Sequence, residues 1–485
     1  MKLYCHLHPQ YKKIHYFFTG TFLLLFIVLK SNAQQFTPSV QQFITVNADT
    51  FALTHAKLID GTGSAAKTDQ TIIVMKGRIT DMGNSANTKL PPSIKTIDCT
   101  GKTIIPGLVM MHEHLYYTML LDSFFNVSEM SSSFAKMYLA GGATTIRTGG
   151  SIEPQTDLAI KRMIGEGKLI GPDMDVTAPY IERPGFDIPS LNTIKDSAEA
   201  AASVNFWAAK GCTSFKMYMH ALPEDLRAVV REAHKRGLKV TGHLNTITYR
   251  EAAELGIDNL EHGFMASSDF DTTKKSAQFS TLYSRALLNL SERDERMTNL
   301  IQFLIQKKVA LTSTLPVFEP NTDREIILGG DTSILLPAVR EMVIARWKNA
   351  QHKDSTSAVR FKKNMAWEKQ FYDAGGLLLA GTDPTGSGRT VAGYGSRREI
   401  ELLVEAGFSP VQAIKIATLN GAIYLGREKE IGSIERGKQA DFVILNGDLE
   451  KNIKAIRNTE IVFKKGVGFD SKKIFESVNG KVGLY

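Results

Sequence analysis

Residue types that bind divalent metal ions recur at the ends of short hydrophobic segments in the middle of this chain. The segments TIIPGLVMMHEH, TSFKMYM, LKVTGH, NLEH and LLLAGTD carry, in chain order, His112 and His114, Lys216, His243, His262 and Asp383. Imidazole nitrogen and carboxylate oxygen are ordinary ligands of ions such as zinc. If the ends of these segments meet in space, the six side chains predict a metal site.

The pair His112 and His114 is the most compact of these signals. In a strand, residues two apart point to the same face, so both imidazoles could bind one ion while Glu113 points away. Alone the pair could equally be two ordinary loop histidines. Four of the eight histidines after residue 33 stand at these segment ends, and chance placement explains that poorly. His243 and His262 could alternatively be packed barrel histidines that bind nothing.

Lys216 is unusual because a charged amine is costly in an apolar strand unless it has a partner. It could pair with an acid such as Glu261. It could also react with CO2 and, as a carbamate, bridge two metal ions, which otherwise repel each other. Asp383 follows a buried strand and could bind a metal and accept a proton, or could cap the PTGSG loop that follows.

Eight strand-like segments alternate with helical segments between residues 106 and 425, which predicts parallel strands joined by helices. In a closed barrel of this kind the C-terminal strand ends meet at one mouth. The remaining three strands are expected in ATTIRTGG, DMDVTAP and VALTSTLPV. Two long connections, residues 180–192 and 264–288, are expected to be lids over that mouth.

The two ends of the chain are different in character. Residues 51–105 and 426–485 have short alternating strands broken by turn residues, which favours one small β domain built from both ends. In residues 1–33, Lys12 and Lys13 precede an apolar run that is followed by a small-residue stretch ending at Ala33, which predicts a cleaved secretory signal. The run is shorter than the ~20 residues of a membrane span. The protein is therefore expected to be secreted or periplasmic without a stable membrane anchor, with residues 34–50 as a lead-in.

The composition, 43% hydrophobic and 22% charged, is ordinary for a globular protein. Loss of residues 1–33 removes four lysines and no acid, which lowers the formal net charge of +8 by four. The remainder has no basic block, so nucleic acid is not an expected partner. Cys99 and Cys212 remain and are expected to be unpaired buried thiols, although export would permit a disulfide.

The ordered motifs resemble a known family. PGLVMMHEH, GATTIRTGG, FKMYMHALPEDL, KVTGHL, DNLEHGF, LAGTDP and GSIERGKQADFVIL are together similar to the amidohydrolase superfamily, in the branch of imidazolonepropionases and Xaa-Pro dipeptidase-like hydrolases. The resemblance covers about residue 51 to the C-terminus. It implies an α/β fold, a distorted (β/α)8 TIM barrel with a small β-sandwich domain from both chain ends.

The resemblance also implies roles for the residues named above. His112, His114 and Asp383 would hold one divalent ion, His243 and His262 a second, and carboxylated Lys216 would bridge them. The ions are expected to be zinc, and a hydroxide shared by them would attack the substrate. Asp383 would carry the proton to the leaving amine.

Three further positions are candidates for substrate contact. Tyr218 shares a strand face with Lys216 and could donate a hydrogen bond to the carbonyl, or simply pack in the barrel. Arg147 could bind a substrate carboxylate or pair with a barrel acid. His220 could contact substrate or lie in a surface loop. Thr148 stands where this branch often has an acid.

These observations predict an exported enzyme that hydrolyses a C–N amide bond in a small molecule, a dipeptide or N-acyl amino acid, and that could form a homo-oligomer. One alternative is a mononuclear deaminase or cyclic-amide hydrolase, which typically needs a glutamate shortly after His243, where the sequence has Leu244-Asn245-Thr246. A lactonase or esterase on the same site is a second alternative. A non-enzymatic binding protein on a decayed barrel is the third.

Overall fold

The computed structural model describes residues 35–121, 124–186, 188, 191–322, 324, 330–350, 355–386 and 388–483. The predicted signal, residues 1–33, lies outside this part. Residues 36–485 form one compact unit. No helix among the described residues is long and apolar enough to cross a membrane.

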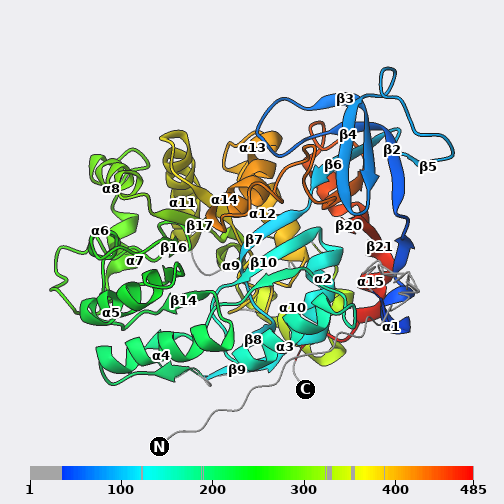
Figure 1. Ribbon diagram of the computed structural model, residues 1–485. Coiled ribbons are helices and arrows are strands. Elements are labelled where there is room, and N and C mark those ends of the chain that lie inside the picture. Colours follow the sequence, from blue (N-terminus) through cyan, green and yellow to red (C-terminus); the bar gives the residue numbers. More distant parts are fainter. Residues whose placement is uncertain are drawn as a thin grey trace, which may run out of the picture. The chain divides into compact units, whose positions relative to one another are not determined.

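Eight parallel strands form the centre of this unit (Figure 1). They are β7 (Leu108–Glu113), β10 (Ala143–Thr148), β11 (Asp173–Asp175), β14 (Ser214–Met217), β15 (Lys239–Gly242), β16 (Asn259–Glu261), β17 (Ala310–Ser313) and β18 (Leu378–Ala380). Thr177, just after β11, bridges to Ser214 of β14. The amides of Thr382 and Asp383 donate to the carbonyl of His112, which connects β18 back to β7. The predicted α/β barrel and its strand order are confirmed.

Helices connect the barrel strands, so the alternation of strands and helices expected from the sequence is observed. They are α2 (Ser131–Ala140), α3 (Pro154–Gly165), α4 (Ser197–Lys210), α5 (Pro223–His234), α6 (Tyr249–Glu254), α8 (Glu295–Gln306) and α11 (Ser355–Asp373). Others are α7 (Tyr283–Leu288), α9 (Leu315–Phe318), α10 (Pro337–Ala350), α12 (Tyr394–Glu405), α13 (Pro410–Lys415) and α14 (Gly421–Tyr424). In α5, Pro223 occupies the first turn and the Asp225 carboxylate accepts from the backbone N–H of Leu222. Such a start satisfies backbone donors that a helix leaves unpaired.

Strands from both chain ends form one nine-stranded sheet, in the order β1-β21-β20-β19-β6-β2-β3-β4, with β5 paired to β2 (Figure 1). The strands are β1 (Ile44–Val46), β2 (Thr50–Leu58), β3 (Lys67–Met75), β4 (Arg78–Asn84), β5 (Lys95–Asp98), β6 (Lys102–Pro106), β19 (Phe442–Asn446), β20 (Thr459–Lys464) and β21 (Val467–Asp470). The sheet has its own apolar core, which includes Phe51, Phe442 and Phe463. The expected pairing of the two ends is therefore observed, whereas the sandwich itself stays a prediction.

Several elements were not expected from the sequence. The short helix α1 (Pro38–Gln41) and β1 lie within residues 34–50, the expected lead-in, and β1 pairs with β21. An antiparallel hairpin, β8 (Tyr116–Leu121) and β9 (Phe124–Glu129), follows the first barrel strand. Two short strands, β12 (Ile181–Glu182) and β13 (Asn192–Thr193), lie in the first expected lid, and β12 pairs with β14. The helix α15 (Ser471–Val478) follows β21.

Candidate metal centre

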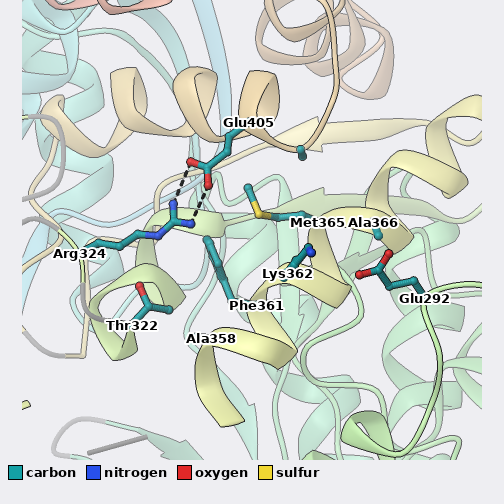
Figure 2. A pocket seen from close by; sticks show the side chains of 10 residues that line it. Glu292, Thr322, Arg324, Ala358, Phe361, Lys362, Met365, Ala366 and Glu405 are labelled. Carbon is teal, nitrogen blue, oxygen red and sulfur yellow. Dashed lines mark hydrogen bonds and ion pairs between the residues drawn. The ribbon is translucent and has the colours of Figure 1, made fainter. Parts of the chain in front are cut away.

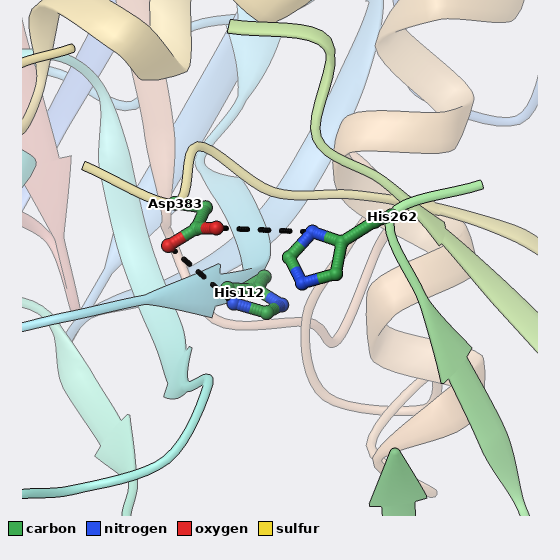
Figure 3. Close-up of side chains that lie close together, drawn as sticks. All are labelled: His112, His262 and Asp383. Atoms are coloured by element: carbon green, nitrogen blue, oxygen red, sulfur yellow. Dashed lines mark ion pairs between the residues drawn. The ribbon is translucent and has the colours of Figure 1, made fainter. Parts of the chain in front are cut away.

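One cavity at the C-terminal ends of the barrel strands is lined by all six predicted metal ligands, His112, His114, Lys216, His243, His262 and Asp383. The ligand atoms of His112, His262 and Asp383 lie within 4.8 Å of one another (Figure 3). One carboxylate oxygen of Asp383 lies 3.7 Å from Nε2 of His112 and 3.1 Å from Nε2 of His114, and the other lies 3.7 Å from Nδ1 of His262. Five of the six side chains are buried, and His243 is half-buried.

Hydrogen bonds to Nδ1 orient three of the imidazoles. The partners are the carboxylate of Glu261 for His112 (2.7 Å), the carbonyl of Gly150 for His114 (3.0 Å) and the hydroxyl of Thr314 for His262 (2.8 Å). An ionised carboxylate and a carbonyl can only accept, so Nδ1 of His112 and of His114 carries the proton. Their Nε2 atoms keep the lone pair that a metal ion needs. Such outer partners are usual around metal-binding histidines.

The electrostatics of the cavity keep the imidazoles of His112, His243 and His262 neutral. Burial, helped by the charge of Lys216, lowers the pKa of His112 to about 4 and that of His243 to about 3. Burial also lowers the pKa of His262 well below its usual value. Although burial opposes it, the neighbouring imidazoles of His112 and His114 hold the pKa of Asp383 well below its usual range. At neutral pH the site therefore offers neutral imidazoles and an ionised carboxylate, the forms that bind metal.

Lys216 has only a loose ionic partner. Its Nζ lies 3.9 Å from Oε1 of Glu261, beyond hydrogen-bond distance. The same oxygen accepts from Nη2 of Arg147 at 2.7 Å and from the hydroxyl of Thr241. Burial lowers the pKa of Lys216 to about 8. An amine with a lowered pKa is a better nucleophile, as reaction with CO2 requires.

The other sequence candidates divide between the cavity and its surroundings. Tyr218 lines the cavity with its ring 5.2 Å from that of His243. Arg147 is fully buried and is not among the lining residues: it donates to Glu261, to Asn259 and to the carbonyl of Met111. The ion pair with a barrel acid is thus the arrangement observed for Arg147.

His220 lies at the rim rather than in the wall of the cavity. Its Nδ1 is 3.4 Å from the carboxylate of Glu182, and its ring stacks on Phe279 with centroids 4.6 Å apart. Glu182 belongs to the first expected lid and Phe279 to the second. His220 therefore connects the two lid segments.

The backbone is strained where two of the ligands leave their strands. His262 has φ of 70° and Asp383 has φ of 48°, the left-handed region that residues other than glycine seldom occupy. His262 directly follows β16 and Asp383 comes three residues after the end of β18, where the chain turns out of the barrel while the side chain lines the cavity. Strain of this kind collects at functional sites. At the end of β10, a side chain on Gly149 would overlap the ring of His112.

Two tyrosines in the cavity wall were missed in the sequence. The hydroxyls of Tyr116 and Tyr180 are hydrogen-bonded at 2.5 Å, and the ring of Tyr180 lies 5.0 Å from that of Tyr218. Tyr116 continues the alternation of His112 and His114 by two residues, which is a signal that could have identified it. Tyr180 lies in an irregular segment whose path no sequence pattern gives. Burial raises the pKa of all three tyrosines, so they remain protonated donors.

A second cavity, of about 410 Å³, is lined by residues of α11, by Arg324 and by the end of α12 (Figure 2). None of the predicted metal ligands lines it. Both terminal nitrogens of Arg324 donate to the carboxylate of Glu405, at 2.8 and 2.6 Å. Two of its charged side chains are therefore paired with each other, and all six predicted metal ligands belong to the first cavity.

Comparison with known proteins agrees with this geometry. The model of the amidohydrolase family matches residues 103–468. The imidazolonepropionase of Treponema denticola is 24% identical over 423 residues, which cover 81% of this chain and 90% of that protein. The adenine deaminase of Paracoccus denitrificans is 43% identical over only 68 residues, 14% of this chain and 11% of its own length. Among solved structures, a Xaa-Pro dipeptidase with methionine bound in its active site has a TM-score of 0.64 at 19% identity and covers 87% of this chain and 100% of its own.

Proposed function

The chain belongs to the amidohydrolase family and is a metal-dependent hydrolase, and from this premise we propose that it cleaves a C–N amide bond in a small molecule. The observation that carries the proposal is the buried group of His112, His262 and Asp383 in the cavity at the barrel mouth. Zinc is the proposed ion, because imidazole and carboxylate ligands suit it.

The donor set fits two ions. His112, His114 and Asp383 would hold one, His243 and His262 the other, and a carbamate on Lys216 would bridge them. The neutral imidazoles, with Nδ1 of His112 and His114 already protonated, support this assignment. When bound, the ions supply Lewis acidity, which lowers the pKa of water and polarises a carbonyl group.

The residues of the chain would share the remaining chemistry. Asp383 is ionised and its carboxylate lines the cavity, so it can accept the proton of the attacking water. It would then deliver that proton to the leaving nitrogen as the C–N bond breaks. Tyr218 keeps its proton and would donate a hydrogen bond to the carbonyl oxygen as negative charge develops there.

Deamination of a purine-type ring is less well supported. After His243 the chain has Leu244, which is buried in the core, and Asn245, whose side chain is bonded to the backbone of Ser280. Asp383 is the one carboxylate among the described residues that line the cavity. A second acid that could protonate a ring is therefore lacking in the described wall.

The proposal also includes export of the protein. The lysines, apolar run and small residues of positions 1–33 support a cleaved signal. Dipeptides and N-acyl amino acids are the amides first expected from the sequence, and the structurally similar Xaa-Pro dipeptidase is named for the first of these classes. Dipeptides and N-acyl amino acids both carry a free carboxylate. The charge of the cavity wall therefore bears on whether they fit.

The test is amine release by the zinc-loaded protein from a panel of dipeptides, N-acyl amino acids, neutral amides and lactones, with metal content measured on the same samples. We expect Asp383→Asn to lower amide hydrolysis by about 10²–10⁴-fold. We expect Lys216→Ala to lower the bound metal from two ions to one or fewer. Full activity and two tightly held ions in Lys216→Ala would disprove the carbamate, and hydrolysis of lactones alone would disprove the amide.

A further inference from the structure

We propose that the cavity selects an uncharged amide whose substituent is apolar and aromatic, an N-aryl amide, in preference to one with a free carboxylate. The inference deepens the proposed function and rests on it. Its basis is the side chains that surround the metal-binding group.

The described wall of the cavity offers no cation to a substrate carboxylate. Apart from the four histidines, Lys216 is the one basic side chain among the described lining residues, and it lies 1% exposed on β14. The nearby arginines are already occupied: Arg147 with Glu261, and Arg183 with Asp225 through two hydrogen bonds of 2.8 Å.

The wall is instead apolar and aromatic. Val127 of the hairpin, Ile152 after β10, and Val317 and Phe318 of α9 face the cavity from different elements. Phe186 continues this surface from the first lid, with its ring 6.1 Å from that of Tyr218. These elements come from separate parts of the chain, so the apolar character belongs to the assembled cavity and not to one segment.

An aromatic substituent fits this surface for a specific reason. Tyr116, Tyr180 and Tyr218 form a row in which Tyr180 and Tyr218 meet edge to face, at 70° and 5.0 Å. Aromatic rings attract one another in this arrangement beyond the area they bury. The hydroxyls of Tyr116 and Tyr180 bind each other, one donating and the other accepting, and the rings of the row supply an aromatic contact surface.

A carboxylate in the same position would lose its hydration without gaining an ionic partner. Burial of an unpaired charge is strongly unfavourable. Dipeptides and N-acyl amino acids are therefore expected to be poor substrates compared with neutral amides of the same size.

The experiment compares two compounds that differ only in charge, 4-acetamidobenzamide and 4-acetamidobenzoate. Zinc-loaded wild type is assayed for release of the aromatic amine, and zinc-loaded Asp383→Asn is used to measure binding by calorimetry. We expect the neutral compound to have at least about tenfold higher kcat/KM and tighter binding. Equal or better binding of the benzoate would overturn the inference.

A matched pair of variants locates the effect in the wall. Val317 is half-buried on α9 and faces the cavity, so Val317→Lys adds a cation there and Val317→Met adds a neutral chain of similar length. We expect Val317→Lys to shift the ratio of the two compounds at least about tenfold toward the benzoate, and Val317→Met to retain the preference of wild type. The same ratio in both variants would contradict the inference.

The two readouts separate this inference from the proposed function. If the benzamide binds more tightly but neither compound nor any other amide is cleaved, amide hydrolysis fails while the selectivity stands. If the benzoate and the dipeptides are cleaved faster than the benzamide, amide hydrolysis stands and the inference fails.

Discussion

Thr314 illustrates how a single residue outside the ligand set can control the metal site. It is fully buried, and its hydroxyl lies 2.8 Å from Nδ1 of His262. The backbone of His262 is strained, and the hydrogen bond helps to fix the orientation of its ring. The orientation of this imidazole therefore depends on a neighbouring loop as well as on its own strand.

Thr314→Val removes the hydrogen bond while keeping the shape of the side chain. We expect zinc affinity to fall by about 10–100-fold, as for other outer partners of metal-binding histidines. Competition with a chromogenic chelator measures it. Thr144→Val is the matched control, because the buried hydroxyl of Thr144 has no hydrogen-bond partner. An equal loss of affinity in both variants would rule out this role for Thr314.

At the scale of elements, the barrel strands are held by helices that contribute buried polar groups. Glu368 of α11 accepts from the hydroxyl of Ser313 on β17 at 2.7 Å and from the side chain of Asn364 at 2.8 Å. It is fully buried, and burial raises its pKa to about 7 from an ordinary value of 4.5. The folded protein therefore holds a proton here that the unfolded chain releases at lower pH.

The pH dependence of stability follows from that difference. The stabilising contribution of protonated Glu368 is complete below about pH 4.5 and is lost as the pH rises toward 7, by at most about 3 kcal/mol. Glu368→Gln stays neutral at every pH. Its free energy of unfolding, measured in urea, should therefore rise relative to that of wild type between about pH 4.5 and 7. Parallel stability curves for the two proteins would show that Glu368 does not titrate in this range.

At the scale of the whole molecule, the two chain ends depend on each other for folding. Strand β19 lies between β6 and β20, so the N-terminal and C-terminal strands share one ladder. The ring of Phe463 stacks on that of Phe51 with centroids 5.1 Å apart and lies 4.7 Å from that of Phe442. One core therefore contains aromatic residues more than four hundred positions apart in the sequence.

Phe463→Ala is expected to lower the free energy of unfolding by about 3–5 kcal/mol, because it leaves a cavity in this core. Combined with Phe51→Ala, the loss should be smaller than the sum of the two single losses by about 0.5–1.5 kcal/mol, the energy of the ring pair. Urea unfolding of the four proteins gives the coupling. Strict additivity would mean that the two ends do not stabilise each other through these rings.

The sequence by itself determined the order of the barrel strands and their alternation with helices. It also determined the convergence of six side chains, His112, His114, Lys216, His243, His262 and Asp383. It could do so because these features follow from local periodicity and from one geometric rule, that parallel strands end at the same mouth. The sequence also predicted that strands from both chain ends pair with each other, but it did not predict that β1 is one of them.

Only the tertiary structure decided what surrounds those ligands. The partner of Arg147, the hydroxyl pair of Tyr116 and Tyr180, and the apolar wall that includes Val317 are contacts between segments distant in the chain. Each depends on the path of an irregular loop or on a side-chain rotamer, which hydrophobic periodicity does not specify. Metal binding could therefore be predicted from residue types and spacing. The charge and shape of the substrate cavity, in contrast, arise when the loops pack over the barrel mouth.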